Sequence, residues 1–302
     1  MDLLDLVLLY DCNLKCSYCT ITNEMRARTE LKTAEVAGQI VNASQRGCTS
    51  LSITGGEPTL RSDLLPIIRH ARAHAFTDIK IQTNGLVFAH NLNLEKAVDA
   101  GLTRVGVSVH GFSPNDSLAY ENSARAEPGT QQLMLQAIDN LVAASVSLTV
   151  DLILMTSTQS TVFGALKALH ERGVNAFNLW LVSLTDNNAE NLDSLPRITE
   201  LLPVVTQCLD YGKSHKIKVE SLHIPRCLLP EHLTQVNHPG VGKEVKVVTP
   251  DAVFELKRSV LSGGVKSERC KECSYDDSCP GLRADYVAQF GDEELQPLIV
   301  DR

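Results

Sequence analysis

Three cysteines stand close together near the start of the chain, in the segment DCNLKCSYCT. Cys12, Cys16 and Cys19 have the spacing CxxxCxxC, and thiolates are preferred ligands of zinc, copper(I) and iron–sulfur clusters. A structural zinc site needs a fourth cysteine or histidine, and the next ones along the chain are the distant Cys48 and His70. The spacing therefore favours a [4Fe–4S] cluster that leaves one iron open to a ligand from outside the protein. The alternatives are a zinc site completed from afar and three thiols that share no ligand.

A second group of cysteines lies near the C-terminal end, in the segment CKECSYDDSC. Cys270, Cys273 and Cys279 have the spacing CxxCxxxxxC, and Cys227 precedes them in the chain. Four thiolates can close a tetrahedral zinc site or hold a second [4Fe–4S] cluster, and the spacing does not choose between the two. The two groups together predict two metal centres.

Alternating strands and helices must position these cysteines. Short apolar runs predict strands, and segments with helical periodicity between them predict helices. Gly47, Gly101 and Gly173, each between a helix and the next strand, are expected to adopt the left-handed conformation that ends a helix. The expected strands are residues 6–10, 51–54, 79–83, 104–110, 148–155 and 177–184, and the expected helices are residues 34–46, 63–75, 92–100, 130–144, 160–172 and 197–213.

This alternation predicts parallel strands joined by right-handed crossovers. We expect an α/β fold with a partial (β/α)6 TIM-type barrel, and an open doubly wound sheet is the alternative. The CxxxCxxC segment follows the first strand, so it lies at the carboxyl ends of the strands, where such barrels place their sites. Residues 1–219 form the expected barrel domain. Residues 220–302 form a cysteine-rich C-terminal region, in which a metal centre would compensate for weak apolar periodicity.

Composition excludes several classes of protein. The chain has 302 residues, of which 43 % are hydrophobic and 21 % charged, as in ordinary globular proteins. Its apolar runs are too short for a membrane helix, and a formal net charge of −8 makes nucleic acid an unlikely partner. The N-terminal residues do not have the pattern of a secretory signal. Nine cysteines without such a signal predict a reducing compartment, so we expect a cytoplasmic protein.

The motifs at the expected strand ends resemble those of the radical S-adenosylmethionine (SAM) superfamily. The CxxxCxxC spacing with an aromatic residue before its last cysteine is the signature of that family, and TGGEPTL, QTNG and SVHG end the next three strands. The resemblance covers roughly residues 5–220 and implies one [4Fe–4S] cluster that binds SAM. It also implies contacts to the methionine amino group from Gly55, Gly56, Glu57 and Pro58, to the ribose or carboxylate from Thr83 and Ser108, and to the adenine from Tyr18.

The C-terminal cysteines resemble the auxiliary-cluster region called SPASM, or its shorter relative called twitch. The match is incomplete, because no cysteine follows Cys279. The resemblance implies that Cys227, Cys270, Cys273 and Cys279 hold one auxiliary [4Fe–4S] cluster, and structural zinc is the alternative.

The implied activity is the reductive cleavage of SAM to a 5′-deoxyadenosyl radical, which abstracts a hydrogen atom from a substrate. We expect this enzyme to act in the maturation of a ribosomally made peptide. The alternative substrate is a small metabolite that is oxidised or rearranged in natural-product or cofactor biosynthesis, and a remote alternative is a non-catalytic iron–sulfur electron carrier. The expected partners are a flavodoxin- or ferredoxin-type electron donor and, for a peptide substrate, a separate leader-binding protein.

Two further residues are candidates for catalysis. His110 ends the fourth strand and is expected to face the pocket, whereas Cys208 on an apolar helical face is either a thiol hydrogen donor or a small buried residue. Asp151 on the fifth strand is a further candidate for the pocket wall. Residues 121–128 are expected to form a solvated loop over the barrel mouth.

Overall fold

The computed structural model describes residues 1–28, 30–116, 118–144, 146–238, 242–256 and 264–299. The strands are β1 Leu3–Val7, β2 Ser50–Thr54, β3 Asp78–Thr83, β4 Arg104–Val109, β5 Ser147–Leu154, β6 Ala176–Leu181, β7 Lys218–Leu222, β8 Val236–Asn237, β9 Val245–Val248, β10 Val253–Glu255, β11 Gly264–Val265 and β12 Leu282–Arg283. The α-helices are α1 Asn23–Arg26, α2 Thr33–Gln45, α3 Leu64–Ala73, α4 Asn91–Ala100, α5 Ala119–Ala124, α6 Thr130–Ala143, α7 Val162–Glu171, α8 Ile198–His215 and α9 Ala284–Phe290.

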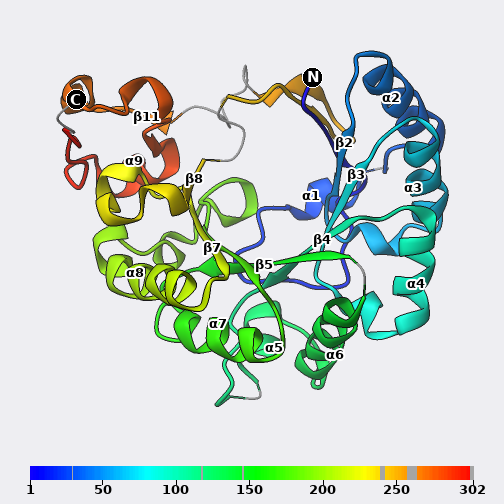
Figure 1. Cartoon of the computed structure of the whole chain (residues 1–302), viewed down its shortest axis with the longest axis horizontal. Coiled ribbons are helices and arrows are strands. Elements are labelled where there is room, and N and C mark those ends of the chain that lie inside the picture. Colours follow the sequence, from blue (N-terminus) through cyan, green and yellow to red (C-terminus); the bar gives the residue numbers. More distant parts are fainter. Residues whose placement is uncertain (29, 117, 145, 239–241, 257–263, 300–302) are drawn as a thin grey trace.

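Ten strands form one curved sheet, in the order β10-β9-β1-β2-β3-β4-β5-β6-β7-β8. Neighbouring strands from β9 to β8 are parallel, and β10 runs antiparallel to β9. Figure 1 shows α2, α3, α4, α6, α7 and α8 around the outside of the sheet. The six expected strands and six expected helices are present in the expected order, which confirms the α/β fold.

The two faces of the sheet differ in polarity. Leu4 of β1 pairs in register with Leu51 of β2, and both are fully buried. The next pair, Asp5 and Ser52, lines a cavity on the other face. Because successive side chains of a strand point to opposite faces, the apolar row packs against the helices and the polar row faces the inside of the curve. Each fully buried leucine stabilises the fold by about 1.5–3 kcal/mol.

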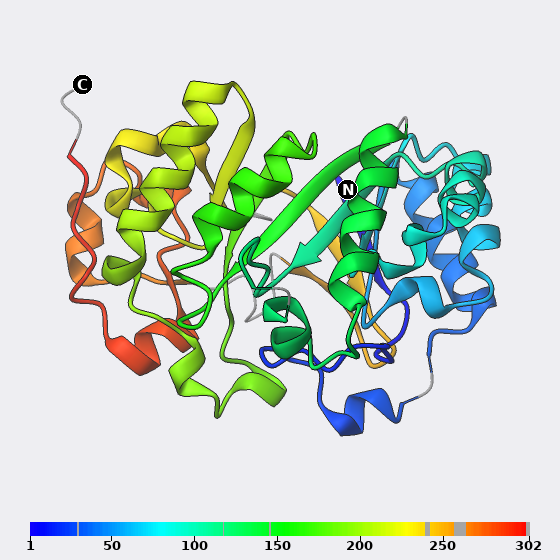
Figure 2. The ribbon, with the colours of Figure 1, turned by 90° about the horizontal axis from the view of Figure 1, so that it is seen from below.

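The main sheet extends beyond the expected barrel domain. The expected boundary after residue 219 falls within β7, which pairs with β6. Further along the chain, β9 pairs with β1 through Leu3 and Val245, and β10 adds one more strand at that edge. Beyond the main sheet, the C-terminal segment contains a two-stranded antiparallel sheet of β11 and β12 and the helix α9. Figures 1 and 2 show this C-terminal segment near α8, on the opposite side of the molecule from α2.

The connections contain short helices that the sequence pattern did not predict, and one of them replaces part of an expected loop. Residues 119–124 form helix α5, in which Tyr120 and Glu121 are buried. The expectation of a solvated loop over residues 121–128 is therefore wrong for its first part. Glu121 is held because its Oε1 accepts a hydrogen bond of 2.8 Å from the backbone N–H of Gln131. The three glycines expected at helix ends do have positive φ, of +77° at Gly47, +119° at Gly101 and +100° at Gly173.

Among the described helices, none combines the length and the apolar character needed to cross a bilayer.

Candidate functional site

A cavity of about 550 Å³ opens at the carboxyl ends of the barrel strands. It is lined by residues from the loop after β1 and from the ends of β2, β3, β4, β5 and β6. Most residues expected to hold the cluster and cofactor lie on its wall: Cys12, Cys16, Tyr18, Cys19, Gly55, Gly56, Thr83 and Ser108. The catalytic candidate His110 lies there as well. Asp151 and Trp180 also line it. The structure thus brings together residues that lie far apart in the sequence.

The sulfurs of the first cysteine group each contact a potential hydrogen-bond donor. Cys12 Sγ accepts from the backbone N–H of Leu14 at 3.4 Å, and Cys19 Sγ accepts from Arg26 Nη2 at 3.6 Å. Cys16 Sγ lies 3.2 Å from His110 Nε2. Burial, together with the neighbouring cysteines, raises the pKa of Cys16 to about 12, and burial also raises the pKa of Cys12. Thiols of this kind become thiolates when a metal replaces their protons.

The glycine pair after β2 packs against the loop after β1. A Cβ on Gly55, whose φ is +136°, would lie 2.3 Å from the carbonyl oxygen of Leu9. A Cβ on Gly56 would lie 2.0 Å from the carbonyl oxygen of Asp11. The backbone N–H of Gly56 donates to Leu9 O at 2.8 Å, so the two loops are hydrogen-bonded at this close approach. Glycine is therefore required here for contact between the two loops, and both glycines still line the cavity.

Glu57 does not contact the cavity with its carboxylate, which corrects its expected role at the methionine amino group. The side chain is 1 % exposed. Its Oε1 accepts hydrogen bonds from Thr83 Oγ1 at 2.7 Å and from Thr59 Oγ1 at 2.6 Å, and its Oε2 accepts from the backbone N–H of Asn84 at 2.8 Å. Glu57 thus ties the end of β2 to the end of β3, and it positions both loops.

Thr83 and Ser108 line the cavity, but their hydroxyl groups already have partners. Thr83 Oγ1 donates to Glu57 and accepts from the backbone N–H of Gly85 at 3.0 Å. Ser108 Oγ accepts from Gln82 Nε2 at 3.0 Å. Tyr18 Oη lies 3.0 Å from His110 Nδ1, and burial raises the pKa of Tyr18 well above its usual value.

Arg61 is a buried residue of this region that sequence reasoning missed. Its Nη1 donates to Leu31 O at 2.6 Å and to Leu8 O at 3.2 Å, which connects it to the residues on either side of the cysteine loop. Its Nε donates to Asp63 Oδ1 at 2.7 Å. This hydrogen bond from Arg61 is the main reason that the pKa of Asp63 is lowered. The signal in the sequence was the arginine directly after GGEPTL, two residues before an aspartate.

The floor of the cavity carries both signs of charge. Asp5 and Asp151 line it together with Lys80. Asp151 accepts hydrogen bonds from Gln82 Nε2 at 2.9 Å and from Asn178 Nδ2 at 2.7 Å. Burial raises the pKa of both carboxyl groups, and the nearby Lys80 partly offsets the effect. The inside of the barrel is therefore polar and able to bind a ligand by hydrogen bonds.

Cys208 does not reach the cavity. It is fully buried on α8 within the apolar core, and burial raises its pKa to about 12. The hypothesis of a thiol hydrogen donor is therefore wrong for Cys208, and the alternative of a small buried residue holds. Cys48 is buried as well, and its Sγ contacts the carbonyl oxygen of Ser50 at 3.4 Å.

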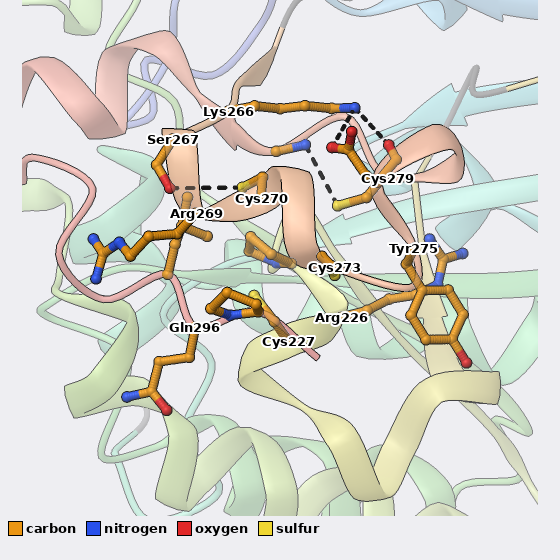
Figure 3. Close-up of a pocket in the computed structure, with 15 residues that line it drawn as sticks. Arg226, Cys227, Lys266, Ser267, Arg269, Cys270, Cys273, Tyr275, Cys279 and Gln296 are labelled. Carbon is orange, nitrogen blue, oxygen red and sulfur yellow. Dashed lines mark hydrogen bonds and ion pairs between the residues drawn. The ribbon is translucent and has the colours of Figure 1, made fainter. Parts of the chain in front are cut away.

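The second group of cysteines lines a separate, smaller cavity. Cys227, Cys270, Cys273 and Cys279 all contribute to its wall, and Figure 3 shows their side chains around a common space. Burial raises the pKa of Cys227, and the nearby thiolates of the other three raise it further. Arg226, Lys266 and Arg269 line the same cavity together with Asp276, which forms an ion pair of 2.9 Å with Lys266. Among the described residues, no three Cys, His, Asp or Glu side chains are close enough to share a single metal ion.

Hydrogen bonds fix two of these C-terminal sulfurs. The backbone N–H of Gly281 contacts Cys279 Sγ at 3.4 Å, and Ser267 Oγ lies 3.8 Å from Cys270 Sγ. Both contacts are drawn in Figure 3. The C-terminal segment is anchored to the barrel by Arg283, which donates to Leu181 O at 2.8 Å at the end of β6.

Solved structures share this fold at low sequence identity. The structure titled native anSMEcpe with bound AdoMet superposes with a TM-score of 0.69 and 16 % identity, over 97 % of this chain and 92 % of that one. Streptococcus suis SuiB bound to S-adenosylmethionine gives a TM-score of 0.64 and 15 % identity, over 95 % of this chain and 74 % of that one. These likenesses concern the fold.

Curated relatives match a shorter segment more closely. A probable GTP 3′,8-cyclase of Methanococcus maripaludis is 39 % identical over 104 residues, which are 34 % of this chain and 34 % of the relative. The match thus spans about a third of that relative's length. The Radical SAM superfamily model matches residues 6–162, which are more than half of the chain. The chain therefore belongs to the Radical SAM superfamily, whose members use a [4Fe–4S] cluster and SAM.

Proposed function

We propose that this protein is a radical SAM enzyme that abstracts a hydrogen atom from a peptide substrate bound in the barrel. The observation that carries the proposal is that Cys12, Cys16 and Cys19 open into the same cavity as the glycine pair Gly55–Gly56. A cluster on three cysteines has one iron free for SAM, and the cavity has room for a cofactor and part of a substrate.

The residues at this site suit the cluster and the cofactor. The donor set of three thiols is soft, as iron–sulfur clusters require. Tyr120 Oη is buried close to the cysteines and has no hydrogen-bond partner among the described residues. When bound, the cluster and SAM together supply the 5′-deoxyadenosyl radical that takes a hydrogen atom from the substrate.

The protein contributes orientation and exclusion of water. Gly55 and Gly56 present backbone groups to the methionine end of the cofactor. Glu57 positions their loop through its hydrogen bonds with Thr83 and Asn84. Tyr18 and Ser108 lie on the wall where the adenine and ribose would bind. The strands enclose the reacting atoms and so protect a radical from side reactions.

We further propose that Cys227, Cys270, Cys273 and Cys279 hold one auxiliary [4Fe–4S] cluster. The arrangement of four sulfurs around one cavity supports this proposal. An auxiliary cluster could bind the substrate or accept the electron from the product radical. Zinc is the alternative, and it would make the C-terminal segment purely structural.

The charges on the cavity floor bear on the substrate. The relatives named as probable GTP 3′,8-cyclases make GTP a second candidate substrate. A triphosphate is usually bound by several arginine and lysine side chains. This cavity has Lys80 and Arg26, and it places Asp5 and Asp151 on its wall. One lysine and one arginine beside two carboxyl groups are a poor match for a triphosphate, whereas the carboxyl groups suit the amide and hydroxyl groups of a peptide.

Structural neighbours also support a peptide substrate. Their titles include anSMEcpe with bound Kp18Cys peptide and SuiB bound to precursor peptide SuiA.

The proposed reaction also needs two protein partners. A flavodoxin- or ferredoxin-type protein would deliver the electron, and a separate leader-binding protein would present the peptide.

The test is anaerobic reconstitution with iron and sulfide, followed by addition of dithionite and SAM. We expect release of 5′-deoxyadenosine, and no increase when GTP is added. A preparation with full iron content that releases no 5′-deoxyadenosine would favour the non-catalytic electron carrier. If the protein forms a cyclised nucleotide from GTP, the substrate is a nucleotide and the proposal of a peptide substrate is wrong.

A further inference from the structure

His110 lies against the cysteine loop with a partner at each ring nitrogen. Its Nε2 lies 3.2 Å from Cys16 Sγ, and its Nδ1 lies 3.0 Å from Tyr18 Oη. One face of the ring stacks on Tyr120, with centroids 5.2 Å apart and planes at 27°. The Tyr18 ring meets the imidazole edge-on at 4.9 Å. The side chain is 2 % exposed, so these contacts fix the ring in one orientation.

The direction of each hydrogen bond follows from the chemistry of the partners. A thiolate that binds iron has no hydrogen to donate, so a favourable contact with Cys16 Sγ needs a hydrogen on His110 Nε2. A neutral imidazole with that hydrogen has a bare Nδ1, and this nitrogen accepts from the Tyr18 hydroxyl. One tautomer of His110 therefore satisfies both contacts.

We propose that His110 donates a hydrogen bond to Cys16 Sγ and thereby raises the reduction potential of the cluster in the barrel, and that Tyr18 selects the tautomer that makes this possible. The inference rests on the proposed function, because it takes Cys16 as a cluster ligand. An added electron increases the negative charge on the sulfur ligands. A donor at one sulfur therefore stabilises the reduced cluster more than the oxidised one.

The other two cysteines of the group have longer contacts. The donors at Cys12 Sγ and Cys19 Sγ lie at 3.4 Å and 3.6 Å, compared with 3.2 Å for His110 at Cys16. The imidazole that makes the contact at Cys16 is 2 % exposed, and one of its faces is covered by Tyr120. This role differs from the expected catalytic one, because His110 acts on a cluster ligand and positions no substrate proton.

The experiment is a redox titration of the reconstituted full chain, followed by electron paramagnetic resonance in the absence of SAM. The signal of the barrel cluster is the one lost when Cys12, Cys16 and Cys19 are all changed to Ala. The variant His110→Leu is compared with the unchanged protein at the potential where half of the unchanged protein's barrel cluster is reduced. At that potential we expect the ratio of reduced to oxidised barrel cluster in His110→Leu to be about tenfold lower. That ratio equals a shift of about 59 mV to lower potential for a one-electron couple.

Two variants separate the hydrogen bond from packing. His110→Gln keeps an N–H close to the position of Nε2 and should restore most of the potential. Tyr18→Phe removes only the hydroxyl group, so both tautomers of His110 become available and the potential should fall by less than in His110→Leu. The matched control is His170→Leu, because His170 Nδ1 also bonds a tyrosine, Tyr211 Oη at 2.9 Å, but on α7 and α8 away from the cysteines. That control should leave the potential unchanged.

An unchanged midpoint in His110→Leu, or equal midpoints in His110→Leu and His110→Gln, would overturn the proposal. If His110→Leu fails to retain iron, Tyr18→Phe decides, and a midpoint identical to that of the unchanged protein refutes the role. A different result would follow if Cys12, Cys16 and Cys19 did not hold a cluster at all. The variant with all three changed to Ala would then keep every redox signal.

Discussion

The carboxylate of Glu57 accepts a hydrogen bond of 2.7 Å from the hydroxyl of Thr83, at the meeting point of the ends of β2 and β3. The same carboxylate also accepts from the backbone of Asn84 and from Thr59. A residue that seemed suited to bind the cofactor's ammonium group therefore holds together two loops that line the cavity. This distinction can be measured.

Glu57→Ala should lower the stability of the fold. Its hydrogen-bond donors would be left buried without a partner, at a cost of about 1–3 kcal/mol for each group. We expect a free energy of unfolding lower by at least about 2 kcal/mol in urea titrations, accompanied by weaker SAM binding in equilibrium dialysis. Thr83→Val, which removes one of these donors, should show a smaller loss of the same kind. Unchanged stability with a loss of SAM binding would instead mean that the carboxylate contacts the cofactor.

Gly56→Ala should displace the cysteine loop. The added Cβ would lie 2.0 Å from the carbonyl oxygen of Asp11, which is closer than any real contact. We expect the barrel cluster to be lost or poorly formed, with a clear drop in iron per chain. The matched control is Gly38→Ala in α2, because a Cβ at Gly38 would have no atom within 4 Å. This substitution should stabilise the helix by about 0.5–1 kcal/mol. Normal iron content in Gly56→Ala would show that the two loops can move apart without consequence.

Asp63→Asn should remove one source of acid sensitivity. The hydrogen bond from Arg61 lowers the pKa of Asp63 in the folded chain, so its contribution to stability is present above the unfolded pKa of about 3.9 and is lost as the pH falls through the lower folded value. In the iron-free chain, Asp63→Asn should be less stable than the unchanged protein near neutral pH. Below about pH 4 the difference should shrink. Urea unfolding at several pH values measures it, and a difference that stays constant with pH would contradict the assignment.

Sequence reasoning located the strands because they are short apolar runs between segments with helical periodicity, and it located the cysteines because they follow a strand end. It could not find β9 beside β1, since Leu3 and Val245 pair across nearly the whole chain and such short strands have no distinctive pattern. Helix α5 was missed because the segment AYENSA is too short to show a helical periodicity, and only the tertiary structure shows that Tyr120 is buried. The sequence also could not predict where the Glu57 side chain points. An acidic residue after two glycines can either face a ligand or form hydrogen bonds inside the protein.

Changing Cys270, Cys273 and Cys279 together to Ala should remove the auxiliary cluster and leave the barrel cluster in place. We expect about four irons per chain instead of about eight, because each cubane holds four. Cleavage of SAM should continue without coupling to the substrate, since the barrel site remains. Iron analysis with zinc analysis is the measurement. A finding of about four irons and one zinc in the unchanged protein would make this segment structural.

The most direct test of the central claim is 5′-deoxyadenosine formation by a variant with Cys12, Cys16 and Cys19 all changed to Ala. The reconstituted variant, dithionite and SAM are incubated without oxygen, and iron is measured on the same sample. If these cysteines hold the cluster that binds SAM, the variant keeps about half of the iron and forms no 5′-deoxyadenosine. SAM cleavage at the rate of the unchanged protein would contradict the claim.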